Sequence, residues 1–410
     1  MAKDKSKSKP SSKSRPNSKL RVALVCDWLT EIGGAEQVLL QLTKLFPDAP
    51  IYTSQYRRKS APWFDHCDVR PSRLLNILPR GLRKFIAPLR ALYFNHLTIS
   101  GYDLVISVCN AECKGVKTPD STLHIAYLQG PPTQYYWSQY DRYIDNPGFG
   151  RWNWLARFGL KLLLKPMRKS DLKASARPDI MVVNSHYVLD EMRKYYNRDG
   201  EVILPPVGVE KLREVITSPD DLCSSVLPVN EREKGAPFGG EPYFVIAGRQ
   251  VNWKRMDLAV AACAKAVENL LVVGDGPEHS KLVELAGDNK NVKFLPKYNG
   301  ATEIAGYFAD AKGFIFPSLE PFGIIPVEAL ACGCPVLAFS QGGSQDIVED
   351  GENGLFFAEQ SVDSLVDGIK EFNKTKFNRT KVAKTTDRFA SANFDKHWLE
   401  LIERNLEVKD

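Results

Sequence analysis

Short, almost wholly apolar runs of strand length recur along this sequence and alternate with stretches of helical periodicity. Strands that are apolar on both faces are typical of parallel sheets covered by helices on either side. The alternation therefore predicts an α/β architecture of the doubly wound kind. In the first half of the chain the predicted strands are 20–26, 50–56, 103–109, 124–129 and 180–185.

The same alternation starts again after a polar, Gly- and Pro-rich stretch at 216–242. We therefore predict two tandem Rossmann-like domains, 20–215 and 243–384, joined by that linker. The segment 385–410 is helical in pattern and is expected to pack back on the first domain. Ligands of such sheets lie beyond the carboxyl ends of the strands, so two facing sheets predict a ligand cleft between the domains. The strands predicted for the second domain are 243–248, 270–276, 292–296, 313–318, 334–340 and 354–357.

The basic excess of the chain is confined to its first residues. Residues 1–19 hold seven of the 55 Lys and Arg residues and one of the 49 acids, so the remainder balances at 48 against 48. This stretch is predicted to be a disordered basic tail, serving either solubility or contact with an anionic surface. The body gives no reason to expect binding to nucleic acid.

The eight cysteines are scattered, which favours a reduced, cytoplasmic setting. No apolar run approaches the roughly 18 residues of a membrane-spanning helix. No Cys, His or Asp-x-Asp pattern predicts a metal site, so neither a metal nor another cofactor is expected.

The densest group of candidate residues follows the strand predicted at 313–318. Glu320 ends the strand, a turn contains Gly323, and Pro326 is predicted at the first position of a helix that carries Glu328. A helix start of this kind suits a phosphate, and flanking carboxylates suit sugar hydroxyls. The alternative is that Glu328 is a surface residue and Glu320 only complements the helix dipole.

A second group follows the strand at 243–248. Arg249 comes directly after Gly248, and Lys254 lies in the loop before the next helix. Two cations at a strand end fit a diphosphate, although a solvated basic loop is the simpler interpretation. Gly33 and Gly34 form the first strand-to-helix turn, where backbone can approach a ligand. The short GDG at 274–276 is interpreted as a turn.

Taken in order, these motifs resemble glycosyltransferase family 4, whose members have the GT-B fold and transfer sugar from nucleotide sugars with retention of configuration. The resemblance covers about residues 20–400. It rests on GGAE (33–36), NSHYV (184–188), GR…K (248–254), VVGDGP (272–277), EPFGIIPVE (320–328), GG (342–343) and GENG (351–354).

The resemblance implies a role for each candidate residue. Arg249 and Lys254 hold the leaving diphosphate, Glu320 meets hydroxyls of the donor sugar, and Glu328 binds the ribose. Gly33 and Gly34 approach the donor from the other domain, and the base lies against the loop after 292–296. The backbone of the turn contacts sugar and phosphate, through Phe322, Gly323, Ile324 and Ile325.

Two positions depart from the pattern of the family. Gln129 stands where members commonly carry a His that contacts the donor sugar, and Gln cannot titrate near neutral pH. Asp346 stands where Glu is usual. Gln129 is therefore an uncertain contact to the donor sugar.

The implied function is metal-independent transfer of a hexose, mannose or similar, from a GDP- or UDP-sugar to a glycan or lipid-linked acceptor in envelope polysaccharide or glycoconjugate synthesis. The alternatives are a non-catalytic protein that binds sugar nucleotides, and a GT-B epimerase or phosphorylase.

Two segments, 69–95 and 151–177, interleave basic and apolar residues, as helices do that lie on anionic membranes. They predict peripheral attachment at the inner face of a membrane; the alternative is that their apolar residues pack on the first domain.

Overall fold

The computed structural model describes residues 20–30, 33–79, 86–133, 136–138, 140–145, 150–217, 237–295 and 301–409. The tail 1–19, most of the predicted linker and the loop 296–300 lie outside the described residues. None of the described helices is both long and apolar enough to cross a bilayer.

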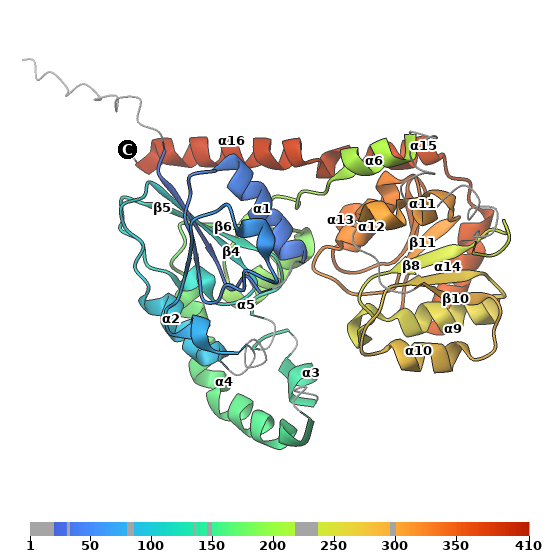
Figure 1. Ribbon diagram of the computed structural model, residues 1–410, viewed down its shortest axis with the longest axis horizontal. Coiled ribbons are helices and arrows are strands. Elements are labelled where there is room, and N and C mark those ends of the chain that lie inside the picture. The colour runs from blue at the N-terminus through green and yellow to red at the C-terminus, as the bar shows by residue number, and fades with distance from the viewer. Residues whose placement is uncertain are drawn as a thin grey trace, which may run out of the picture.

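Two parallel sheets, each covered by helices on both faces, form the molecule (Figure 1). The predicted fold class is thus confirmed. The first sheet has the order β3-β2-β1-β4-β5-β6-β7, so the order in which strands are added reverses between β1 and β4. Its strands are β1 (Val22–Cys26), β2 (Ile51–Thr53), β3 (Val69–Pro71), β4 (Leu104–Cys109), β5 (Leu123–Leu128), β6 (Ile180–Val183) and β7 (Glu201–Val202).

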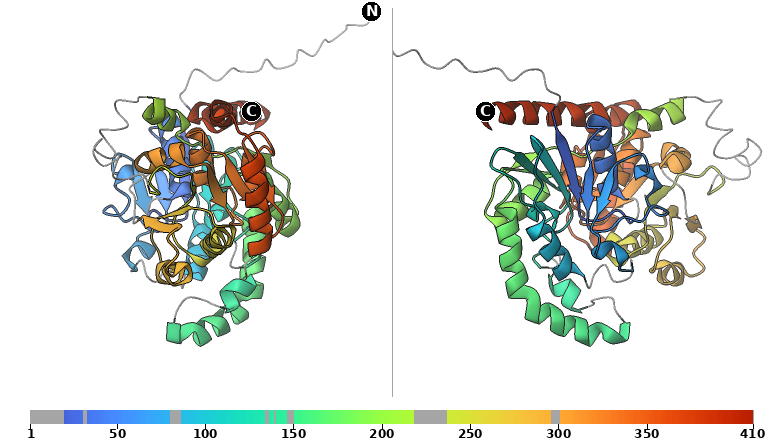
Figure 2. Two further views of the ribbon diagram at one scale, coloured as in Figure 1. Left: turned by 90° about the vertical axis from the view of Figure 1, so that its right-hand side faces the viewer. Right: turned by 60° about the vertical axis from the view of Figure 1, so that its left-hand side comes forward.

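Helices bury apolar residues on both faces of the first sheet. On one face, Leu39 of α1 packs with Leu24 and Tyr127, and on the other, Phe94 of α2 and Met192 of α5 pack with Val25. The helices before the linker are α1 (Gly34–Leu45), α2 (Ala87–His96), α3 (Tyr140–Asp145), α4 (Asn153–Ser175), α5 (His186–Tyr196) and α6 (Val209–Thr217). The N-terminal half of α4 extends away from the body, with α3 beside its end (Figures 1 and 2).

The second sheet has the order β10-β9-β8-β11-β12-β13, and its strand order reverses between β8 and β11. Its strands are β8 (Phe244–Ala247), β9 (Leu270–Val273), β10 (Val292–Leu295), β11 (Gly313–Phe316), β12 (Val336–Phe339) and β13 (Gly354–Phe357). The helices after the linker are α9 (Met256–Ala266), α10 (His279–Ala286), α11 (Ala301–Asp310), α12 (Ile324–Ala331), α13 (Ser344–Ile347), α14 (Val362–Lys374), α15 (Arg379–Lys384) and α16 (Ser391–Lys409).

The last helix packs against the first sheet. Trp398 of α16 is fully buried, and its ring lies 5.8 Å from that of Tyr127 on β5 in an edge-to-face arrangement. The helix begins at Ser391 rather than at 385, because residues 385–389 form a 3-10 turn whose Phe389 belongs to the core of the second domain.

The helix α6 belongs to the second domain, although the sequence analysis assigned residues up to 215 to the first. Val209 and Leu212 are buried among residues of the second core, such as Ile304 and Leu330. The helix α6 is amphipathic, and its apolar side packs against α11 and α12 of the second domain. Val207 also lies in the second core, so the first domain ends before this residue.

Candidate active site

Arg249 occupies the loop that follows β8, at the point where the strand order of the second sheet reverses. Gly248 before it has a φ of +134°, a conformation that side chains with a Cβ rarely adopt. The Arg249 side chain is exposed, and no described residue accepts a hydrogen bond from it. This cation is therefore available to a ligand at the carboxyl edge of the sheet.

The GDG turn after β9 supports the Arg249 loop. A Cβ on Gly274 would lie 2.2 Å from the Gly248 carbonyl oxygen, so only glycine fits there. The fully buried Gln250 donates from Nε2 to the Gly274 carbonyl at 2.6 Å and from its backbone to the Asp275 carbonyl at 2.9 Å. The sequence analysis predicted the turn but missed its support of the Arg249 loop. The signal for that support was a pair of glycines, separated by one residue, directly after a buried strand.

Lys254 and Glu320 form an ion pair between the loops after β8 and β11, where the strand order of the second sheet reverses. The Lys254 Nζ lies 2.6 Å from the Glu320 Oε1, and the two side chains are only 13% and 11% exposed. Ser318 donates from Oγ to the same carboxylate oxygen at 2.7 Å. The loops after β8 and β11 thus bring together two residues that are 66 positions apart in the sequence.

The turn 320–325 places a helix N-terminus beside this ion pair. Gly323, with a φ of +111°, precedes α12, which begins at Ile324 and has no side-chain cap. The predicted start at Pro326 was two residues late, because a proline fits anywhere in the first turn, where no N–H is needed for the helix. Uncapped N–H groups at a helix start favour an anion.

The side chain of Phe322 is buried in the core of the second domain and is not available to a ligand. Its ring lies 5.7 Å from that of Phe389 in an edge-to-face contact. Ile325 lines a small pocket together with Lys254 and Ser318. Gly343 packs against this turn so closely that a Cβ would come within 2.2 Å of the Phe322 Cα.

Glu328 lies in the second turn of α12 and is half-buried. Burial raises the pKa of Glu328 to about 7, although the positive charge of Lys254 acts in the opposite direction. No hydrogen bond to its carboxylate comes from a described residue. A carboxylate with this freedom is able to accept hydrogen bonds from paired hydroxyls.

Gly33 and Gly34 reach the second domain from the start of α1. A Cβ on Gly34 would lie only 2.8 Å from the Ile324 Cδ1, so the two domains touch at this point. The glycine turn therefore faces the N-terminus of α12, where the sequence analysis placed the donor.

Two further contacts between the domains escaped the sequence analysis. Ser185 caps α5 by accepting from the Val188 backbone N–H, and its Oγ donates to the Pro321 carbonyl at 2.5 Å. The His186 backbone donates to the Asp346 Oδ2 at 2.9 Å, and its ring pairs with the same carboxylate. The N-cap pattern after β6 was visible in the sequence, but its partner 136 residues away was not.

Gln129 follows β5 directly and is half-buried at the carboxyl edge of the first sheet. Its carbonyl accepts from the Asn184 Nδ2 at 2.9 Å, and Asn184 is the neighbour of Ser185. Gln129 is therefore part of the same strand edge as the residues that touch the second domain.

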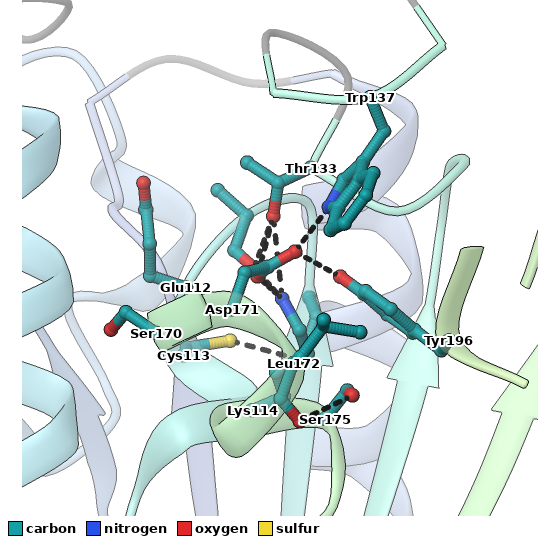
Figure 3. A network of polar contacts seen from close by, with 12 residues as sticks. Glu112, Cys113, Lys114, Thr133, Trp137, Ser170, Asp171, Leu172, Ser175 and Tyr196 are labelled. Carbon is teal, nitrogen blue, oxygen red and sulfur yellow. Dashed lines mark hydrogen bonds and ion pairs between the residues drawn. The ribbon is translucent and has the colours of Figure 1, made fainter. Parts of the chain in front are cut away.

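A buried polar network joins the loops after β4 and β5 to the helices α4 and α5 (Figure 3). The Lys114 Nζ lies 2.7 Å from the Asp171 Oδ1, and Trp137 and Tyr196 each donate to the Asp171 Oδ2 at 2.7 Å. Burial alone would lower the pKa of Lys114, but the Asp171 carboxylate outweighs it and holds that pKa above its usual value.

Asp27, directly after β1, fixes the neighbouring loop by accepting four backbone hydrogen bonds from residues 110–113. In the described ranges, no three His, Cys, Asp or Glu side chains gather as metal ligands would.

Comparison with known proteins finds similarity to glycosyltransferases. The family model described as "Glycosyl transferases group 1" matches residues 229–389, which include β8 to β13 and all the candidate residues of the second domain. D-inositol 3-phosphate glycosyltransferases of Mycobacterium bovis and Mycobacterium tuberculosis are 29% identical over 208 residues. That alignment covers 47% of this chain and 43% of each relative, so it spans less than half the length of these curated relatives.

Solved structures match nearly the whole chain. The Anabaena protein HepE in complex with UDP has a TM-score of 0.65 at 17% identity, covering 94% of this chain and 100% of that one. The sucrose-phosphate synthase of Thermosynechococcus elongatus has a TM-score of 0.63 at 17% identity, covering 95% and 100%. At these identities the likeness establishes the fold. The chain therefore has the GT-B fold, with two Rossmann-like domains.

Proposed function

We propose that this chain is a retaining glycosyltransferase of family 4 that needs no metal ion. It would move a hexose from a nucleotide-diphosphate sugar to a glycan or lipid-linked acceptor. The observation that carries the proposal is the arrangement, at one strand edge, of Arg249, the Lys254–Glu320 pair and the uncapped start of α12. Among the described residues Arg249 has no partner for its side chain. This arrangement faces the glycine turn of the other domain.

The charges of this edge suit a leaving diphosphate. Arg249 and Lys254 supply two cations, and the start of α12 adds the positive end of its dipole. Groups preorganised for the charge that develops on a leaving phosphate stabilise the transition state more than the ground state. Removing one of them is expected to lower turnover by about 10² to 10³.

The two carboxylates suit the hydroxyls of a donor. Glu320, held by Lys254 and Ser318, would accept from the sugar, and Glu328 would accept from the ribose. In the reaction an acceptor oxygen bonds to the anomeric carbon while the bond from that carbon to the diphosphate breaks. The acceptor hydroxyl gives its proton to the departing phosphate oxygen. Attack from the face that the diphosphate leaves retains the configuration.

The identities of the sugar, the nucleotide and the acceptor are part of the proposal. HepE has been solved with UDP and with UDP-glucose, and the curated relatives are named for an inositol phosphate acceptor. Both names support a nucleotide-sugar donor and a hydroxyl acceptor for this chain. We propose mannose or a similar hexose, carried by GDP or UDP, and an acceptor in envelope polysaccharide or glycoconjugate synthesis.

The test is binding and slow cleavage of a panel of UDP-, GDP- and ADP-sugars with EDTA present. Wild type is compared with Glu320→Ala and Arg249→Ala. We expect one donor to bind and to be cleaved, and both variants to lose cleavage. A donor that binds but is never cleaved, even with membrane extract as acceptor, would instead favour the non-catalytic sugar-nucleotide-binding protein.

Retention is tested separately on the product. Proton NMR of the glycoside formed at early times gives its anomeric configuration, which we expect to equal that of the donor. An inverted product would refute the mechanism while leaving the transferase activity intact.

A further inference from the structure

Among the described residues, the helix α4 packs on the first domain through its C-terminal half. Met167, Asp171 and Ala174 are buried, and they recur every three or four residues, so they share one face. Before Met167 none of the residues of α4 is buried. The helix has 23 residues and spans about 35 Å, and Figures 1 and 2 show its first half extending beyond the body.

The free half of α4 exposes large apolar side chains. Trp154, Phe158 and Leu162 are spaced by four residues and are 65%, 64% and 66% exposed. Leu155 and Trp152, about half exposed, extend this surface. The packing alternative left open for 151–177 therefore holds only for the second half of the helix. Contiguous exposed apolar side chains of this size mark an interaction surface.

Four exposed lysines continue the surface along α4. They are Lys161, Lys165, Lys169 and Lys173, each four residues from the next, and no described residue forms an ion pair with any of them. Like charges at this spacing repel one another in a free helix. An anionic partner would relieve that repulsion.

No acid balances these lysines on the exposed side of the helix. The one acid between 151 and 177 is Asp171, which is buried and pairs with Lys114. Among the arginines of the segment, Arg157 donates to the carbonyls of residues 144 and 145, and Arg168 donates to that of Tyr136. Arg177 donates to the Gly115 carbonyl, and Arg151 lies over the ring of Trp152. The apolar and lysine-rich surface thus requires a partner that is apolar and anionic together.

The other predicted membrane segment, 69–95, also exposes apolar residues, such as Leu74 and Ile77, but two of its cations are paired. Arg90 is buried and pairs with Glu112, with 2.5 Å between Nε and Oε2, and Arg70 pairs with Asp68. Of the remaining cations, Arg80, Arg83 and Lys84 lie outside the described residues. The inference therefore rests on α4 alone.

We propose that the exposed face of α4, from Trp152 to Lys173, binds the surface of an anionic lipid bilayer. The apolar side chains would enter the boundary between headgroups and acyl chains, and the lysines would meet the anionic headgroups. As the crossover between the parallel strands β5 and β6, α4 runs back from their carboxyl ends. Its free half therefore lies on the side of the sheet that carries Gln129.

This inference deepens the proposed function, because a transferase held there would meet a lipid-linked acceptor at the membrane. It is tested without any enzyme assay, by flotation of the full chain with vesicles of phosphatidylcholine alone or with one quarter phosphatidylglycerol. We expect flotation with the anionic vesicles only, and its loss in 0.5 M salt.

Two variants and two matched controls locate the contact. F158S/L162S should weaken binding at least ten-fold, and K161Q/K165Q/K169Q by about 10²-fold, at roughly five-fold for each lysine near the surface. The controls remove exposed residues of the same kinds elsewhere, in L285S/L399S and K376Q/K381Q/K384Q, and should bind as wild type does. Unchanged circular dichroism and unchanged thermal unfolding show that the α4 variants are folded.

Three results would overturn the membrane proposal. They are no flotation of the wild type, equal losses in the control variants, and binding to RNA without binding to vesicles. A dimer in solution that F158S/L162S dissociates would assign the same face to a second copy of the chain. None of these results bears on donor cleavage, so the proposed function is judged separately.

Discussion

Glu328 should make the stability of the folded chain depend on pH. Its pKa of about 7 lies above the value of about 4.3 for an unfolded glutamate. Between these values the folded chain holds a proton that the unfolded chain has released, so this residue makes the folded state less stable as pH rises. Glu328→Gln should therefore gain stability relative to wild type between pH 5 and pH 8, as measured by urea unfolding.

The same residue should make donor binding depend on pH. An ionised carboxylate accepts a stronger hydrogen bond from ribose hydroxyls than a neutral acid does. We expect the affinity of wild type for its nucleotide sugar to rise roughly five- to ten-fold from pH 6 to pH 8, and that of Glu328→Gln to stay constant. Calorimetric titration measures both, and parallel curves for the two proteins would exclude this role.

The Lys254–Glu320 pair should affect stability and catalysis differently. Lys254→Met leaves a nearly buried carboxylate without its cation, which should cost about 1–3 kcal/mol of unfolding free energy. Adding Glu320→Gln should restore most of that stability, while turnover stays about 10² to 10³ below wild type. Recovery of turnover together with stability would show that the pair is merely structural.

At the scale of elements, the GDG turn should control the position of Arg249. Gly274→Ala introduces a Cβ within 2.2 Å of the Gly248 carbonyl at a φ of +117°. We expect a loss of about 1–3 kcal/mol in stability and at least a ten-fold loss in donor turnover, by analogy with other misplaced catalytic groups. Gly306→Ala is the matched control, because its Cβ would meet nothing within 4 Å.

The strands were largely predictable from the sequence, because a buried parallel strand must be apolar at nearly every position. The two strands that were missed, β3 and β7, are short edge strands with half-buried or exposed residues, such as Arg70 and Glu201, and so lack that pattern. The helix start at Ile324 was misplaced, because Pro326 is compatible with several positions in a first turn.

At the scale of the whole molecule, Ser185 should link helix capping to the approach of the two domains. Ser185→Ala removes the cap of α5 and the bond to the Pro321 carbonyl. Ser361→Ala is a close control, since Ser361 caps α14 in the same way within one domain. Both should lose about 1 kcal/mol of stability, but only Ser185→Ala should raise the KM for the donor. An equal KM for the two variants would contradict a role in domain closure.

Contacts between distant parts of the chain were beyond the sequence. The motifs named Arg249, Lys254, Glu320 and Glu328 one by one, yet nothing local in them showed that Lys254 pairs with Glu320. Gln250 and the Lys114–Asp171 pair carry no periodic signal, because their partners are set by the tertiary fold. The sequence analysis placed α6 in the first domain for the same reason, although its residues pack in the core of the second.

The central claim is that the edge formed by Arg249, Lys254, Glu320 and the start of α12 cleaves a nucleotide sugar. Its most direct test is kcat/KM for release of nucleoside diphosphate, with EDTA present, in wild type, Arg249→Ala and Lys376→Ala. Lys376 is an exposed cation of the same domain for which no described residue forms an ion pair. The account predicts a fall of about 10² to 10³ for Arg249→Ala alone. Equal rates in the three proteins, or no release from any donor, would contradict it.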